Sequence, residues 1–251
     1  MNCIYWDDNF ISAFTDVPSA EKHKHFLIQI FVCIDFPVEI DLINKKITSY
    51  CIILDSNIEH CFFGKDNTYF TMLIDPTSDL ALHLRKNFIN VDKGYGTIDI
   101  SVLRKIDIKM DNLSKQINCD EYNAFIKMFL KILENNDEEE FEVDERIKKV
   151  INLVQESMDY KITIKELANK LCISESRLSH LFKVSYGIPL KGYILMQKWK
   201  LAYKSILINR NVTRAAMDAG FDSPSHFACT NRRLTGMNSQ ILLNNSRFLK
   251  V

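Results

Sequence analysis

Short apolar runs separated by turn residues dominate residues 20–108. They are rich in Ile, Val, Phe and Tyr, are bounded by Asp, Asn, Pro or Gly, and cover Phe26–Ile34, Val38–Leu42, Ile47–Leu54, Tyr69–Ile74 and Thr97–Ile100. β-Branched and aromatic residues in such runs predict strands, and their spacing predicts a sandwich or small barrel. The segment from Pro76 to Phe88 could be a short helix or a loop that crosses it.

Between residues 121 and 133 the apolar positions change to helical spacing. They are Tyr122, Phe125, Ile126, Phe129, Ile132 and Leu133. A stripe this broad could cover the predicted barrel or pair with its copy in a second chain. We favour the second, which makes the chain a homodimer. Residues 1–134 are therefore predicted to form a β-rich domain that ends in this amphipathic helix.

One pattern occurs twice nearer the C-terminus. Each copy has a short helix with an inward alanine, Ala168 or Ala216, then a tight turn and a second helix. This pattern predicts helix-turn-helix units at residues 163–184 and 212–235, and such a unit lays its second helix in a DNA major groove. Two ordinary helical hairpins in an all-α domain are the alternative. The repetition of cap, turn and basic outer face argues against that alternative.

Local capping chemistry supports both units. Thr163 can cap the first short helix, and Glu166 three residues later completes a capping box. Ser174 is placed to cap the next helix, and Asp222 or Ser223 to cap the last one. Inward apolar residues leave the following side chains on the outer faces, as predicted DNA contacts: Ser176, Arg177, Ser179, His180 and Lys183 in the first unit, and Ser225, His226, Cys229, Arg232 and Arg233 in the second.

The segment between the two units is predicted to be one long helix at residues 189–208, because no Gly or Pro interrupts it after Gly192. A helix of this length spans roughly 30 Å at the usual rise per residue. Successive major-groove segments on one face of DNA lie about 34 Å apart. The spacing therefore predicts that both second helices enter the major groove on adjacent turns of one duplex.

Charge divides the neutral chain into two opposite halves. Residues 144–251 carry 18 Lys and Arg against 8 Asp and Glu, a net charge of +10, and residues 1–143 carry 14 against 24, a net charge of −10. A basic domain fits a polyanionic partner such as double-stranded DNA. The acidic stretch at 135–143 is predicted to be a solvated linker, which leaves residues 144–251 as the DNA-binding domain. The predicted fold class is α+β with two domains.

The C-terminal domain resembles the DNA-binding domain of the AraC/XylS family of bacterial transcription regulators. The resemblance rests on the order of the two units, on Lys198–Ala202 in the helix between them, and on Ala219–Phe227 at the start of the last helix. It implies a sequence-specific transcription regulator whose outward residues contact DNA and which could contact RNA polymerase. It also implies that the N-terminal domain is a cupin-like barrel that dimerises and senses a small-molecule effector.

The sequence departs from the family pattern at several places. Cys172 stands in the first turn where many relatives have Gly, and Asn231 stands at a position that is usually apolar, which predicts looser packing of the last helix. Cys229 stands where a longer base-reading side chain is common. The second unit is therefore expected to read sequence less stringently, with Arg232 and Arg233 bound to phosphates.

Three histidines of the N-terminal domain leave several interpretations open. His23, His25 and His60, with Glu39, resemble the ligand set of metal-binding cupins, and a metal-dependent enzyme joined to a DNA-binding domain is the alternative function. The carboxylate is not at the usual short interval, where Gln29 is nearest, so we predict no metal, no cofactor and no enzyme. The histidines could instead line an effector pocket or serve the structure alone.

Cysteine usage and the absence of apolar segments indicate the compartment. The seven cysteines form no Cys-x-x-Cys pair, which indicates a reducing environment. The chain has neither a long uninterrupted apolar stretch nor a signal peptide, so it is expected to be cytoplasmic, with no membrane partner. A redox sensor based on Cys51, Cys61 or Cys119 has only the presence of these residues in its favour.

Overall fold

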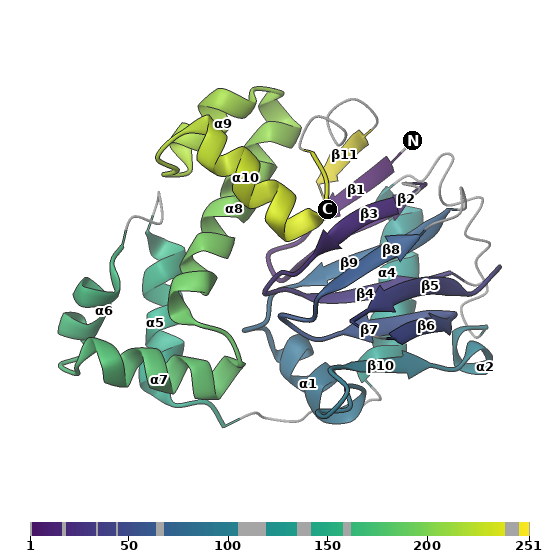
Figure 1. The fold of residues 1–251 in the computed structure, drawn as a ribbon, viewed down its shortest axis with the longest axis horizontal. Helices are drawn as coiled ribbons and strands as arrows, with labels where there is room; N and C mark the ends of the chain where they lie inside the picture. The colour runs from purple at the N-terminus through teal and green to yellow at the C-terminus, as the bar shows by residue number, and fades with distance from the viewer. Residues whose placement is uncertain are drawn as a thin grey trace. The chain divides into compact units, whose positions relative to one another are not determined.

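The computed structural model describes residues 2–16, 19–33, 35–43, 45–63, 68–104, 119–134, 142–157, 162–238 and 246–250 (Figure 1). The chain forms two compact units, one of Met1–Glu139 with Arg233–Val251 and one of Glu140–Arg232. Most of the predicted linker at 135–143 lies outside the described residues, so the predicted division of the chain stays a prediction.

The first unit is built on two β-sheets. One has seven strands in the order β10-β7-β4-β9-β2-β1-β11, and the other has four in the order β3-β8-β5-β6. Among the described strands, all pairings are antiparallel except that of β1 with β11. The strands are β1 Asn2–Trp6, β2 Phe10–Thr15, β3 Ser19–His23, β4 Ile28–Val32, β5 Val38–Leu42, β6 Lys45–Ser49, β7 Cys51–Leu54, β8 His60–Phe63, β9 Tyr69–Ile74, β10 Tyr95–Ile98 and β11 Ser246–Lys250.

Strand β4 shows how the two faces of the larger sheet are used. All its positions are buried, because alternate side chains enter different cores. Ile28, Ile30 and Val32 join the core on the helical side of the sheet. Phe31 joins the core between the two sheets. Gln29 has the same parity as Phe31, so the polar end of its side chain also lies on the side of the smaller sheet.

Helices α1 (Asp79–Asn87), α2 (Ile100–Leu103) and α4 (Cys119–Glu134) accompany the sheets, and α4 lies across the larger one (Figure 1). The apolar stripe of α4 is buried in the core of its own chain. Phe125 contacts Phe14 and Phe70, and the Tyr122 hydroxyl lies 2.6 Å from Ser12 Oγ. The prediction that this stripe pairs with a second chain is therefore wrong, since its own sheet covers it.

The second unit is helical. Its helices are α5 Glu145–Glu156, α6 Ile164–Lys170, α7 Glu175–Tyr186, α8 Leu190–Asn209, α9 Val212–Asp218 and α10 Pro224–Thr235, the last of which ends in residues grouped with the first unit. Helix α5 was not predicted, although Ile147, Val150 and Val154 give it an apolar face. The β-rich N-terminal and helical C-terminal parts confirm the predicted fold class.

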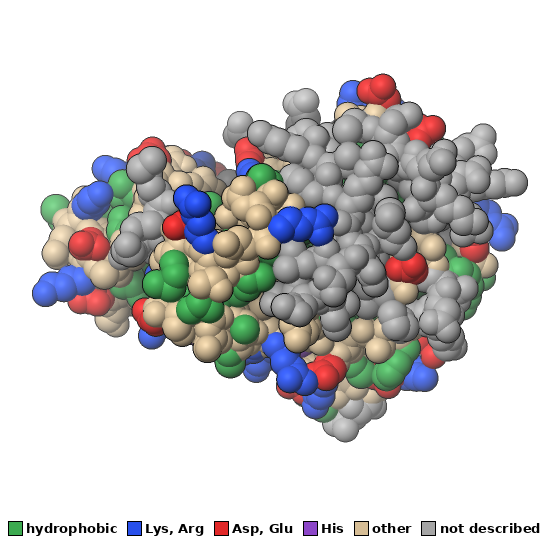
Figure 2. All heavy atoms as spheres, turned by 90° about the horizontal axis from the view of Figure 1, so that it is seen from above, with side chains coloured by type: hydrophobic (Ala, Val, Ile, Leu, Met, Phe, Trp, Pro, Cys, Tyr) green, Lys and Arg blue, Asp and Glu red, His purple; other side chains and the backbone are tan. Residues whose placement is uncertain are grey.

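No helix among the described residues is long and apolar enough to cross a bilayer. The Lys and Arg side chains visible on the helical unit in Figure 2 are spread among apolar and polar groups rather than gathered in one patch. On the face shown, no single basic patch marks an interface with DNA, and the candidate contacts are those of individual helices.

Candidate functional site

The first helix-turn-helix unit consists of α6 and α7. The predicted capping box is confirmed: Thr163 Oγ1 accepts the backbone N–H of Glu166 at 3.2 Å, and the Glu166 carboxylate accepts that of Thr163 at 2.7 Å. Ser174 caps α7 as predicted, because its hydroxyl accepts the N–H of Arg177 at 3.2 Å. In the turn, Cys172 has a φ of 53°, the left-handed conformation that glycine adopts more easily.

Helix α7 presents a polar outer face. Leu178, Phe182 and Tyr186 are buried on its inner side, while Leu181 is half-buried. The side chains predicted to contact DNA lie away from that core: Ser176, Arg177, His180 and Lys183 are exposed and Ser179 is half-buried. Their helical spacing places them where a groove could receive them, and their role in binding DNA stays a prediction.

The second helix-turn-helix unit consists of α9 and α10. Asn211 caps α9 by accepting the N–H of Arg214 at 2.9 Å, a cap that was not predicted. Of the two predicted caps for α10, Ser223 is the one used, and its hydroxyl accepts the N–H of His226 at 3.1 Å. Asp222 instead pairs with His226, with 3.0 Å between carboxylate and Nδ1.

Asn231 anchors α10 to α8. Its side chain is completely buried, and its Oδ1 accepts a hydrogen bond from Trp199 Nε1 at 3.0 Å. The prediction that Asn231 loosens the last helix is therefore wrong, because the amide provides the acceptor that a buried indole N–H requires. Lys198 connects α8 to the turn between α9 and α10, since its Nζ donates to the carbonyl of Gly220 at 3.2 Å.

The outer side of α10 carries the second set of predicted DNA contacts, which are Ser225, His226, Cys229, Arg232 and Arg233, all exposed. Helix α8 joins the two helix-turn-helix units through 20 residues, most of them buried. Because Tyr193, Trp199 and Ala202 lie in the core, α8 is a packed spacer rather than an exposed connector.

Comparison with known proteins decides the identity of this arrangement. A family model described as a helix-turn-helix domain matches residues 167–240. The probable transcriptional regulator LumQ of Photobacterium leiognathi is 26% identical over 192 residues, which cover 73% of this chain and 75% of LumQ. The chain is a DNA-binding transcription regulator with a C-terminal helix-turn-helix domain.

Two solved structures extend the likeness of this chain to both of its units. An apo variant of ToxT from Vibrio cholerae matches with a TM-score of 0.61 and 15% identity, over 94% of this chain and 97% of that chain. Wild-type ToxT with a bound unsaturated fatty acid matches with a TM-score of 0.56 and 18% identity, over 94% and 95%. The alternative of a metal-dependent enzyme finds no support in these comparisons.

The β-rich unit brings the three predicted histidines together. One ring nitrogen from each of His23, His25 and His60 lies within 4.8 Å of the other two. Gln29 joins them, since its Oε1 lies 2.8 Å from His25 Nε2 and 3.1 Å from His60 Nε2. Glu39, the carboxylate considered with them, instead forms an ion pair with Lys46 at 3.2 Å.

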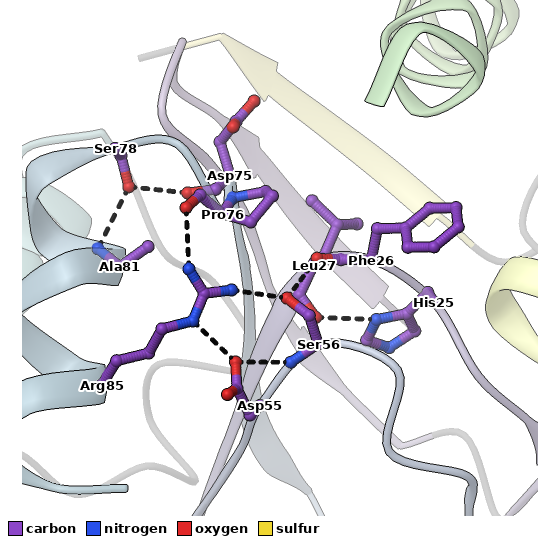
Figure 3. A network of polar contacts seen from close by, with 10 residues as sticks. All are labelled: His25, Phe26, Leu27, Asp55, Ser56, Asp75, Pro76, Ser78, Ala81 and Arg85. Atoms are coloured by element: carbon purple, nitrogen blue, oxygen red, sulfur yellow. Dashed lines mark hydrogen bonds and ion pairs between the residues drawn. The ribbon is translucent and has the colours of Figure 1, made fainter. Parts of the chain in front are cut away.

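A polar network holds the loop that carries His25 (Figure 3). Arg85 of α1 donates to Asp55 Oδ1 at 2.9 Å and to Ser56 Oγ at 2.8 Å. The Ser56 hydroxyl donates in turn to the carbonyl of Phe26, next to His25. The network fixes the backbone of this loop against α1, so the position of His25 is well defined.

The cysteines of this regulator give little support to redox sensing. Cys51 is completely buried, and burial raises the pKa of its thiol to about 12. Burial also raises the pKa of the Cys61 thiol. The thiolate is the reactive form, so both groups are less reactive than a free cysteine. The side chain of Cys119 lies outside the described residues.

Proposed function

We propose that α7 and α10 enter major grooves on adjacent turns of one face of duplex DNA. The observation that carries this proposal is the pair of capped helices with polar outer faces at the two ends of a packed 20-residue spacer. The proposed contacts are Ser176, Arg177, Ser179, His180 and Lys183 from α7, and Ser225, His226, Cys229, Arg232 and Arg233 from α10.

Helices α7 and α10 have different roles, since α7 provides the sequence-specific base contacts and α10 adds affinity through phosphate contacts. On α7, Arg177 has the planar guanidinium that pairs bidentately with guanine, and the serines and His180 accept or donate more permissively. On α10, Arg232 and Arg233 bind phosphates, which adds affinity without sequence information. The net charge of +10 on residues 144–251 favours such a partner.

The acidic β-rich unit regulates the binding of DNA. A small-molecule effector acts there through different affinities for two arrangements of the protein, as any ligand-driven change requires. The fatty acid in one ToxT structure supports an effector of some kind for this chain. The regulator is a cytoplasmic homodimer without enzymatic activity. Its dimer surface lies outside the apolar stripe of α4. RNA polymerase is a further proposed partner.

Replacing Arg177 with alanine tests the assignment of base contacts. We expect a loss of about 1–3 kcal/mol in binding free energy that depends on the base at one operator position. The measurement is a titration of the full chain with the operator and with duplexes that each carry one substituted base pair.

Two further variants separate base from phosphate recognition. Arg177→Lys keeps the charge but loses the bidentate fork, so it should show most of the same loss. Arg232→Ala should weaken binding to all duplexes alike and lower the salt slope by about one. If Arg177→Ala instead behaves like Arg232→Ala, Arg177 contacts a phosphate.

A further inference from the structure

The histidine cluster is formed by segments that lie far apart in the sequence. His23 ends β3 and is the register partner of His60 on β8, His25 follows in the next loop, and Gln29 reaches across from β4 of the larger sheet. The exposed fractions of the three histidines are 8%, 3% and 1%. Imidazoles grouped in this way away from water require a physical explanation.

Backbone carbonyls fix the orientation of all three rings. The Nδ1 atoms lie 2.7 Å from the carbonyl of Glu21 for His23, 2.9 Å from that of Leu27 for His25, and 2.8 Å from that of Ile58 for His60. A carbonyl oxygen only accepts, so each Nδ1 carries a hydrogen. A neutral ring then has its lone pair on Nε2, the nitrogen left for the centre of the cluster.

All three rings are buried, and burial disfavours the charged imidazolium form. Because each neutral ring carries its hydrogen on Nδ1, the centre of the cluster is lined by nitrogen lone pairs rather than by N–H groups.

The Gln29 amide places an oxygen atom at the centre of the cluster. Its Nε2 donates to Thr71 Oγ1 at 3.1 Å, so its Oε1 is the atom turned toward His25 and His60. An oxygen and two nitrogen lone pairs thus face one another with no hydrogen between them. A cation relieves this repulsion, and so does a reversed amide whose NH2 group donates to both rings. These two arrangements lead to different measurable results.

In place of the sequence-based prediction of no metal, we propose that His23, His25 and His60 bind a divalent transition-metal cation through their Nε2 atoms, with Gln29 Oε1 as a fourth ligand. Imidazole suits zinc, nickel, copper or iron, and among the described residues the cluster contains no carboxylate, which calcium or magnesium would prefer. Metal-bound histidines commonly donate their other N–H to a backbone carbonyl, which is the arrangement of all three rings.

The distances fit a site that closes slightly around its ion. Zinc–nitrogen bonds are about 2.0–2.1 Å long, so nitrogens separated by at most 4.8 Å reach the ion after each moves by less than about 1 Å. Small rotations of the side chains provide this movement. The proposed metal is a ligand of the regulatory unit and takes part in no reaction.

Metal titration of the full-length chain tests the site. The protein is treated with a chelator, dialysed and titrated with Co²⁺ while visible absorption is recorded, and Zn²⁺ stoichiometry is measured by elemental analysis. We expect one ion per chain and a cobalt spectrum typical of nitrogen and oxygen ligands. His25→Gln and His60→Gln should each weaken binding at least about 100-fold, because each replaces an imidazole nitrogen with a neutral amide oxygen, a much weaker ligand for these metals.

Two more variants make the result decisive. His83→Gln replaces a buried histidine on α1 outside the cluster and should leave metal affinity unchanged. Gln29→Glu supplies an anionic oxygen and should raise the affinity for the metal about tenfold or more. Unlike a loss of binding, a gain of this kind cannot be caused by misfolding of the variant.

Three results would overturn the proposal. They are no binding of Co²⁺ or Zn²⁺ to the folded wild-type chain, unchanged binding in His60→Gln, and thiolate-to-cobalt charge-transfer bands, which would assign the metal to exposed cysteines such as Cys172 or Cys229. In the first case the reversed Gln29 amide accounts for the cluster.

Discussion

Replacing Trp199 with alanine is expected to lower the free energy of unfolding of the helical unit by about 3–5 kcal/mol. The indole is 1% exposed, stacks on Tyr203 at 5.0 Å between ring centres, and donates to Asn231. Its removal leaves a cavity beside α8 and a buried amide oxygen that has lost this donor. Because Asn231 lies on α10, binding to DNA should weaken as well.

Urea denaturation followed by far-ultraviolet circular dichroism measures this effect. Trp199→Phe is the matched control, since it keeps most of the ring and loses chiefly the hydrogen bond to Asn231, at a cost of about 1–3 kcal/mol. Combining Trp199→Phe with Asn231→Leu should recover part of that loss, because both polar partners are then removed. A loss below about 1 kcal/mol for Trp199→Ala would contradict the packing described for α8.

Replacing Phe125 with alanine is expected to destabilise the β-rich unit by about 3–5 kcal/mol. The Phe125 side chain is completely buried, with ring centres 5.2 Å from Phe14, 5.0 Å from Phe70 and 5.9 Å from Phe129. These contacts hold α4 on its own sheet. The loss should therefore appear as lower stability of the β-rich unit, measured by urea denaturation.

Met128 provides the control on the same helix, because it is 40% exposed. Met128→Ala should change stability by no more than about 0.5 kcal/mol. Sedimentation of each folded variant distinguishes the two roles considered for the helix. If Phe125→Ala left stability unchanged but converted a dimer into monomers, the stripe would be an interface between chains after all.

The helix-turn-helix units could be predicted in detail because their determinants are local. Thr163 with Glu166, and Ser174, cap helices that begin within a few residues of them, and the structure confirms these caps. The long helix between the units was predicted from uninterrupted helical spacing and is found as α8. The role of Asn231 was missed, since its partner Trp199 lies 32 positions earlier in the chain.

The β-rich unit was less predictable because strand pairing joins distant segments. Strands β1, β2 and β3 were missed, and β3 has mainly polar residues with little burial. The run Ile47–Leu54 is divided between β6 and β7, and β8 was not predicted at all. For α4, the apolar stripe alone could not distinguish a sheet from a second chain as its partner.

The histidine cluster lies between these cases. The sequence indicated His23, His25 and His60 as a group, but their convergence depends on the pairing of β3 with β8. Gln29 was recognised as the residue nearest the usual interval after the histidine pair, but only as the lack of a carboxylate there. That its amide joins the cluster while Glu39 pairs with Lys46 depends on the folded arrangement of the strands.

Binding of the full-length chain to the DNA upstream of its own gene, compared with a random duplex of equal length at two salt concentrations, tests the central claim most directly. We expect clear preference for the upstream DNA, with both affinities falling as salt rises, because specific base contacts add to phosphate contacts. Equal and weak binding to both duplexes would contradict sequence-specific recognition by α7 and α10.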